Sequence, residues 1–217
     1  MSTSTPRQFP NLRAELRRTR RLPGTPEITT TIVIWTDGHR FRIQDGDGRR
    51  PAELVGDVTA VQGFGLMPRT IEEFMDAAAA AARPHEVPTE IYGDLHTDVA
   101  EVHEPGMAPW VLPATDLLPA VEQLFVPLET GSWRPAGTGS VLGRETQVME
   151  SEMTGEEDGF TYETRFRWDV AGPFVLARNV NDAQSPGMRV SVEVVEMIEG
   201  EVEETELLAP DVVDRAS

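Results

Sequence analysis

The stretch that decides the fold is residues 160–197, which read FTYETRFRWDVAGPFVLARNVNDAQSPGMRVSVEVVEM. Apolar and polar residues alternate in it over three runs, and a period of two is typical of strands with one buried face. Gly172-Pro173 separates the first run from the second, and residues 181–186 separate the second from the third. Such clusters of Gly, Pro, Asn and Asp favour turns. The stretch therefore predicts three strands of an antiparallel meander.

Further strands are expected on both sides of this meander. Residues 141–149 predict a strand that begins at Gly143-Arg144, and residues 155–159 predict the turn after it. Gly200 leads into a last short strand that ends near Leu208.

The clearest local signal outside the meander is residues 28–43, ITTTIVIWTDGHRFRI. Asp37-Gly38 suits a type I′ turn, so the segment predicts a β-hairpin. In its second strand Phe41 and Ile43 share one face and Arg40 and Arg42 the other. One face of the hairpin is therefore expected to be buried.

Two segments predict helices that cover the sheet. Residues 70–82 begin with a capping box, Thr70 and Glu73, and continue into an alanine run. Residues 115–125 carry an apolar stripe, with Pro119 tolerated in the first turn. A sheet of this size cannot leave one face bare, so the fold class is α+β, a large antiparallel sheet with two or three helices on one face.

The chain of 217 residues contains no cysteine, which excludes disulfides and thiolate metal sites. Its length and patterning predict one α+β domain over residues 28–210 and a flexible tail over residues 211–217. All 19 basic residues are arginine, which reflects the codon usage of a GC-rich genome.

Charge is distributed unevenly along the chain. Residues 1–50 sum to +5 and the remainder to −23, for a net charge of −18. Such an acidic body repels nucleic acid phosphates and anionic membrane surfaces, so no nucleic acid partner is expected and a basic partner is favoured.

The basic N-terminal segment, residues 1–27, admits two interpretations. A short amphipathic helix with Leu12 and Leu16 on one face would make it an arm for nucleic acid, lipid headgroups or an acidic groove. The alternative, which the short length favours, is a frayed and solvated leader. The segment holds neither a secretory signal nor a membrane span, which indicates a cytoplasmic protein.

One cluster of potential metal ligands lies between the predicted helices. His96, Asp98 and His103 have the composition of a two-histidine, one-carboxylate site for iron or zinc. The two histidines are only seven residues apart in a segment rich in Pro and acidic residues, so solvated side chains are the expected alternative. Neither a cofactor nor a metal is therefore predicted.

The C-terminal third resembles a known superfamily in four short motifs: Gly143-Arg144, Trp168-Asp169, FVLAR at residues 174–178, and Glu199-Gly200 with Val202. Over residues 141–210 it is similar to the lipoprotein-carrier superfamily, which comprises lipoprotein carriers of the LolA type, mycobacterial lipid-binding lipoproteins and sigma-factor regulators of the RseB type. The resemblance implies an unclosed β-barrel with helices on its concave face, in whose hollow an acyl chain or a partner's apolar side chain is held.

The chain departs from the superfamily pattern because its members are exported, whereas this sequence shows no signal peptide and no lipobox cysteine. An extracytoplasmic location follows if the true start lies upstream or was trimmed. The resemblance assigns no binding residue one by one.

Three functions follow, in order of preference. The first is a non-catalytic binding protein for an apolar ligand, such as a lipid acyl chain, or for an apolar segment of a protein partner. Its wall is expected to come from Trp35, Phe41, Tyr162, Phe166, Trp168 and Phe174, although an ordinary core would use the same residues. The second is an acidic interaction module of the immunity or inhibitor kind, binding a basic partner through Glu196, Glu199, Glu201 and Glu203. The third is a metal-dependent enzyme that uses His96, Asp98 and His103. The oligomeric state is left open.

Overall fold

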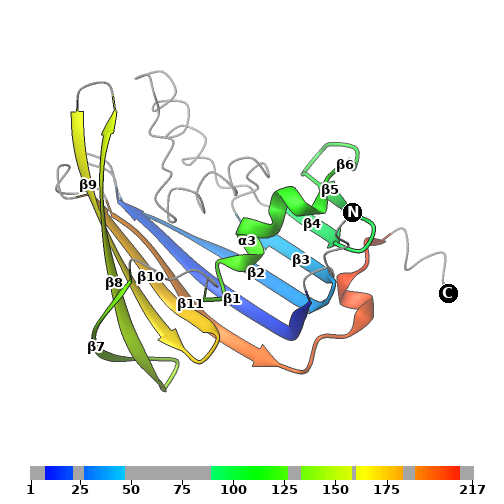
Figure 1. The fold of residues 1–217 in the computed structure, drawn as a ribbon. Helices are drawn as coiled ribbons and strands as arrows, with labels where there is room; N and C mark the ends of the chain where they lie inside the picture. The colour runs from blue at the N-terminus through cyan, green and yellow to red at the C-terminus, as the bar shows by residue number, and fades with distance from the viewer. Residues whose placement is uncertain are drawn as a thin grey trace, which may run out of the picture.

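The described part of the chain is built on one curved antiparallel sheet of 11 strands in the order β6-β5-β4-β3-β2-β1-β11-β10-β9-β8-β7. The computed structural model describes residues 8–21, 27–46, 89–126, 133–157, 160–182 and 189–210. The edge strands β6 and β7 do not pair with each other, so the sheet is an unclosed barrel, and Figure 1 shows it bent around a concave side.

Two meanders make up this sheet. The first consists of β1 (Phe9–Arg21), β2 (Ile28–Gly38), β3 (Arg40–Asp45), β4 (Thr89–Asp94), β5 (Val99–His103) and β6 (Trp110–Leu112). The second consists of β7 (Arg134–Val141), β8 (Arg144–Glu157), β9 (Phe160–Ala171), β10 (Phe174–Asp182) and β11 (Arg189–Glu199). The pairing of β1 with β11 joins the two meanders into one sheet.

The N-terminal segment differs from the sequence-based prediction. Residues 9–21 are neither a frayed leader nor a helix: they form β1, which pairs with β2 on one side and β11 on the other. Leu12, Ala14 and Leu16 are fully or almost fully buried on one face of this strand. The spacing of four between Leu12 and Leu16 fits a strand as well as a helix, and pairing on both edges decides for the strand.

The predicted meander and hairpin are confirmed. Residues 160–197 form β9, β10 and most of β11 in the expected antiparallel order. β2 and β3 form the hairpin, with Phe41 and Ile43 buried and Gly38 at φ +58° in the turn. The left-handed backbone at Gly38 is one that glycine adopts without strain.

The helical content is smaller than expected. In the described part of the chain the only α-helix is α3 (Leu118–Glu122), preceded by the 3-10 helix η1 (Ala114–Leu117). The predicted helix over residues 70–82 lies outside the described residues. The described protein is thus mostly β. In place of the two or three helices predicted on the concave face, the described residues provide the segment η1–α3. Pro119 lies in the first turn of α3 as predicted.

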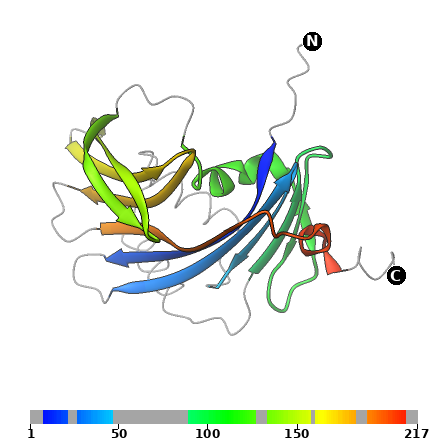
Figure 2. The ribbon, with the colours of Figure 1, turned by 90° about the horizontal axis from the view of Figure 1, so that it is seen from below.

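The predicted last strand near Leu208 is wrong. Residues 201–203 are irregular, and the 3-10 helix η2 (Glu204–Leu207) follows. Glu203 and Glu206 form a capping box that starts η2. Figure 2 shows this C-terminal segment running across the convex side of the sheet.

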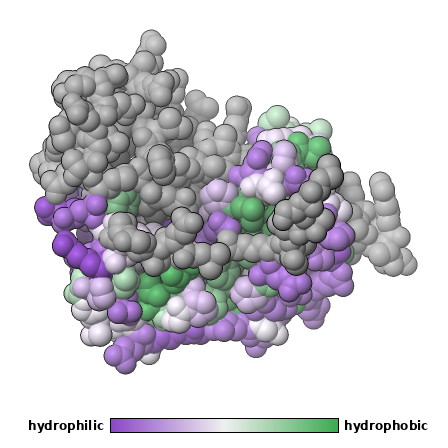
Figure 3. Space-filling view, viewed as in Figure 1, coloured by the Kyte–Doolittle hydropathy of each residue, from purple (hydrophilic) through white to green (hydrophobic). Residues whose placement is uncertain are grey.

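The main core lies on the concave side beneath η1–α3. It joins side chains of both meanders, among them Leu16, Ile34, Phe41, Leu176 and Val194, with Leu117, Val121 and Leu124 from the covering segment. A smaller core on the opposite face consists of Val33, Trp35, Val202 and Leu207. Figure 3 shows hydrophilic side chains along the lower, convex rim and apolar ones above it.

Candidate ligand-binding face

The concave face continues beyond the main core, toward β8 and β9. Residues paired directly across antiparallel strands point to the same face of a sheet. Val192 of β11 belongs to the main core. On one side it pairs with Arg18 of β1, which pairs in turn with Thr30 of β2. On the other side it pairs with Arg178 of β10, and from there the pairing continues to Trp168 of β9 and Met149 of β8. This set of six residues, Thr30, Arg18, Val192, Arg178, Trp168 and Met149, is called the arginine row.

The adjacent row on the same face is mostly apolar. It is formed by the residues two positions away from those of the arginine row on each strand. These also pair directly across the strands, and they are Ile28, Arg20, Val190, Val180, Phe166 and Ser151. This set is called the valine row. Phe166 is buried at the β9 end of the valine row, next to Trp168 of the arginine row. The two rows therefore place aromatic, aliphatic and arginine side chains together on the concave face.

Three aromatic side chains form a cluster on this face. The ring centroid of Trp133 lies 3.8 Å from that of Trp168 and 6.3 Å from that of Phe166. Trp168 and Phe166 are both buried. None of the three belongs to the main core. They form a separate apolar surface on the β8–β10 half of the sheet.

Arg178 lies against this aromatic cluster. The centre of its guanidinium is 4.6 Å from the centroid of the Trp168 ring, an arrangement typical of a cation–π contact. The residue is only 3% exposed. Its Nε and Nη1 atoms have no hydrogen-bond partner, and neither does Nε1 of Trp168, among the residues that the structure describes. Burial lowers the pKa of Arg178 to about 9.

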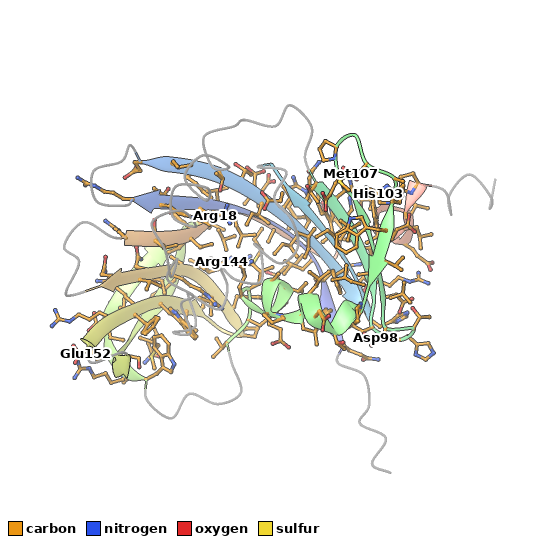
Figure 4. All side chains as sticks on the ribbon, turned by 90° about the horizontal axis from the view of Figure 1, so that it is seen from above. Arg18, Asp98, His103, Met107, Arg144 and Glu152 are labelled. Atoms are coloured by element: carbon orange, nitrogen blue, oxygen red, sulfur yellow. The ribbon has the colours of Figure 1, made fainter. Side chains whose placement is uncertain are left out.

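Arg18 is a second buried cation on the same face. It is 3% exposed, and its Nη2 donates a hydrogen bond of 2.8 Å to Oγ1 of Thr30. One strand, β11, separates it from Arg178, which corresponds to a backbone distance of about 10 Å. Figure 4 labels Arg18 and shows it over the middle of the sheet.

The predicted wall residues fall into different places. Phe166 and Trp168 lie together in the aromatic cluster. Phe41 and Phe174 belong to the main core, where Phe174 lies 5.9 Å from Phe125 between ring centroids. Tyr162 lies in β9, but its side chain is outside the described ones.

Trp35 requires a correction. It lies on the convex face, packed with Val202 and Leu207 under the C-terminal segment, because odd-numbered residues of β2 point away from the core around Ile34. The guanidinium of Arg42 covers it at 4.6 Å from the ring centroid. The six predicted residues therefore do not form one wall.

Trp133 is the aromatic residue that the sequence-based prediction missed. It is not among the predicted wall residues, yet its ring packs on Trp168. Arg178 was missed because arginine is rarely buried without an acidic partner. The signal for Arg178 was present, since Phe174, Leu176 and Arg178 share the alternating parity of one strand face.

The predicted metal cluster is not assembled. In the described residues no group of three or more His, Asp or Glu side chains could hold a metal ion. Asp98 accepts a hydrogen bond of 2.9 Å from the backbone N–H of Thr115. Asp98 immediately precedes β5, whereas His103 ends it, about 13 Å of strand from the first residue Val99, and lies 2.7 Å from Glu101. Figure 4 shows Asp98 and His103 well separated.

The predicted acidic face is partly engaged within the chain. Glu196 accepts a hydrogen bond from Arg13, and Oε1 of Glu199 lies 2.9 Å from Nη2 of Arg144. The side chain of Glu203 takes part in the capping box of η2. Glu201 is exposed. Three of the four glutamates thus have structural roles.

An open depression of about 360 Å³ lies elsewhere, at the β7–β8 edge, lined by Gly137, Thr138, Glu145, Thr146 and Gln147. These residues offer little apolar surface for an acyl chain. Within the described segments no helix is long and apolar enough to cross a membrane.

No protein-family model and no curated protein matches the chain. Among solved structures it is similar to an uncharacterized conserved protein from Thermus thermophilus, with a TM-score of 0.44, 11% identity, and coverage of 92% of this chain and 86% of that chain. It is similar to a LolA superfamily protein from Nitrosomonas europaea, with a TM-score of 0.36, 12% identity, and coverage of 93% of this chain and 92% of that chain.

A third similar structure is LprF from Mycobacterium bovis, with a TM-score of 0.40, 10% identity, and coverage of 91% of this chain and 89% of that chain. All three of these TM-scores are below 0.5.

Proposed function

We propose that the protein is a non-catalytic binding protein that holds an apolar ligand, such as a lipid acyl chain, on the concave face of its sheet. The ligand lies over the β8–β10 half, against Trp133, Phe166 and Trp168. This is also the class of function that the sequence resemblance implies.

The observation that carries this proposal is the aromatic cluster outside the main core. The segment η1–α3 packs on the main core, in which Phe41 and Phe174 have many apolar neighbours. Trp133, Phe166 and Trp168 share the concave side but belong to neither hydrophobic core cluster of the described residues. Ligand sites are mostly apolar and aromatic, with a few polar groups that orient the ligand. The cluster and the adjacent Arg178 have this composition.

Tryptophan fluorescence tests the proposal directly. Bromine quenches tryptophan emission at contact, so a bromine-labelled stearate is expected to quench the protein in a saturable titration. Trp168→Phe removes an indole of the cluster and is expected to lower the quenched fraction by about half or more. Native mass spectrometry of the freshly purified protein is expected to show a bound lipid mass.

The matched control is Trp35→Phe, because Trp35 lies on the convex face under the C-terminal segment. This variant is expected to keep the same absolute quenching as the unmodified protein. Absence of saturable quenching, together with absence of a co-purified lipid, would show the proposal to be wrong. Quenching that disappears in Trp35→Phe would place the ligand on the other face.

The acidic interaction module receives less support. Glu196, Glu199 and Glu203 have partners within the chain, although all three remain exposed. A basic partner would have to compete with Arg13 and Arg144 for two of these carboxylates. The metal-dependent enzyme receives no support from the positions of Asp98 and His103.

A further inference from the structure

We propose that the ligand is an amphiphile with an oxyanion at one end, a carboxylate or a phosphate, and that Arg178 binds this group. The inference rests on the proposed function. It narrows the class of ligand from any apolar molecule to one that has an anionic group as well as an apolar chain. The arginine row binds the head of the ligand, and the valine row with the aromatic cluster binds its chain.

Arg178 has no counter-charge among the residues that the structure describes, which is the first argument. A buried charge destabilises the fold unless an opposite charge or hydrogen bonds compensate for its desolvation. Arg178 is 3% exposed, and its perturbed pKa has burial as its cause. At about 9 this pKa still leaves the guanidinium positively charged at neutral pH. The described protein thus holds a cation in place without an anion to match it.

The second argument is the geometry of the donors. Arginine donates through N–H groups in the plane of its guanidinium, whereas a stacked aromatic ring contacts the face of that plane. The contact with Trp168 therefore holds Arg178 without using its donors. Nε and Nη1 of Arg178 and Nε1 of Trp168 are all buried without a hydrogen-bond partner among the described residues. The N–H groups of Nε and Nη1 point to different sides of the guanidinium, and each can donate to a carboxylate or phosphate oxygen in parallel with Nη2.

The third argument is the local charge. The chain as a whole has a net charge of −18, yet the arginine row and the valine row together hold three arginines and no Asp or Glu. The carboxylates nearest in β8 and β9, Glu150, Glu152 and Asp169, have the opposite parity and point to the other face. Among the described residues, no carboxylate of these two rows therefore faces Arg178, and an anion bound there meets no like charge from them.

The fourth argument is the position of the apolar groups. Phe166, Val180 and Val190 lie one row away from Arg178 on the same face. Trp133 and Phe166 extend this surface toward the β7 edge. A chain attached to an anion at Arg178 thus meets apolar side chains directly, which is the arrangement that an amphiphile requires.

The test compares three bromine-labelled ligands that share one chain: stearate, its neutral methyl ester, and a lysophosphatidic acid. The dissociation constant is read from tryptophan quenching. Stearate or the lysophosphatidic acid is expected to bind about tenfold or more tightly than the ester, the factor that one charge-assisted hydrogen-bond pair supplies. Whichever acid binds more tightly identifies carboxylate or phosphate as the head. Displacement of the labelled acid by inorganic phosphate would assign the site to a free anion and overturn the amphiphile.

The variant Arg178→Met is expected to bind both acids no more tightly than the ester, while its affinity for the ester is unchanged. Arg178→Lys keeps a cation without the fork and is expected to recover part of the preference. The control Arg167→Met removes an exposed arginine of β9 with the opposite parity and is expected to bind like the unmodified protein.

The outcomes separate this inference from the proposed function. Equal affinity of the unmodified protein for acid and ester overturns the inference and leaves apolar binding intact. A preference for acids that survives in Arg178→Met also overturns it, because another group then binds the head. Absence of binding for all three ligands overturns both proposals.

Discussion

Arg178 shows how one side chain connects stability to binding. Its neighbours in the arginine row are Val192 and Trp168, and neither has a negative charge. Burial of Arg178 lowers the stability of the unliganded protein, because desolvation disfavours the charged guanidinium. A bound anion would offset this cost, so the same residue that weakens the free protein favours the complex.

Replacing Arg178 by methionine is therefore expected to stabilise the unliganded protein. At pH 7 the free energy of unfolding should rise by about 1–4 kcal/mol, the range of stabilisation found when buried ion pairs are replaced by apolar residues of similar volume. Urea unfolding of Arg178→Met and of the unmodified protein measures the difference, with Arg167→Met as the exposed control. A less stable Arg178→Met variant would show that the guanidinium has a stabilising partner.

The stabilisation by Arg178→Met should depend on pH in a defined direction. Burial lowers the folded-state pKa of Arg178 to about 9, well below the ordinary pKa that it has in the unfolded chain. Below pH 9 Arg178 is protonated in both the folded and the unfolded state, so burial of its charge destabilises the folded protein to the full extent. Between these two pKa values the unfolded state binds more protons, so the unmodified protein gains stability as pH rises. The advantage of Arg178→Met should therefore shrink between about pH 9 and about pH 10.5, whereas Arg167→Met should show no such trend.

At the scale of elements, the pairing of β3 with β4 depends on one close contact. Phe41 of β3 lies directly opposite Gly93 of β4. A Cβ atom at Gly93 would lie 2.1 Å from Cζ of Phe41, far inside van der Waals contact. The buried ring thus covers the bare backbone of its partner, and the absence of a side chain at position 93 is what allows Phe41 to reach the main core.

Gly93→Ala is expected to lower the free energy of unfolding by about 1–3 kcal/mol, as overpacked cores do. In a Phe41→Leu background the smaller side chain relieves the clash, so the cost of Gly93→Ala should fall by more than half. Chemical denaturation of the four proteins of this double-mutant cycle measures the coupling. The control background is Ile43→Val, which leaves the Phe41 ring in place and should retain the full cost. An equal cost in all three backgrounds would contradict the contact.

At the scale of the whole molecule, β1 of the first meander joins the two meanders into one sheet. It is hydrogen-bonded to β2 and β11, and its buried residues Leu12, Ala14 and Leu16 belong to the main core. A backbone hydrogen bond from Gly200 to Asn11 and side-chain bonds between Asn11 and Val202 add contacts between β1 and the segment after β11. The described sheet is therefore expected to unfold as one cooperative unit.

Leu16→Ala tests this cooperativity. Loss of this buried side chain should cost about 2–5 kcal/mol, the usual range for Leu→Ala in cores. Unfolding followed by tryptophan fluorescence and by far-ultraviolet circular dichroism should shift to the same lower midpoint. The adjacent Arg17→Ala, on the exposed face of β1, should change stability by about 0.5 kcal/mol or less. Two separate transitions in Leu16→Ala would show that the meanders unfold independently.

Elements that depend on residues close together in the chain could be predicted from the sequence, whereas contacts between distant residues could not. Residues 160–197 and 28–43 alternate with a period of two between strong turn signals, so their strands were predicted correctly. β1 was missed because Leu12 and Leu16 fit both periods and the arginines around them suggested solvent. The contacts of Trp133 and Arg178 could not be predicted, because the residues that they touch lie on other strands.

The sequence by itself determined the strands of the second meander, the β2–β3 hairpin and the alternation that gives each strand two different faces, because these depend on residues close together in the chain. Only the tertiary structure decided that β1 lies between β2 and β11, that Trp35 faces away from Phe41, and that Arg178 is buried beside Trp168. Each of these depends on pairs far apart in the chain, such as Leu12 with Glu199. Local periodicity places a side chain on a face, but long-range pairing decides what covers that face and whether a charge on it has a partner.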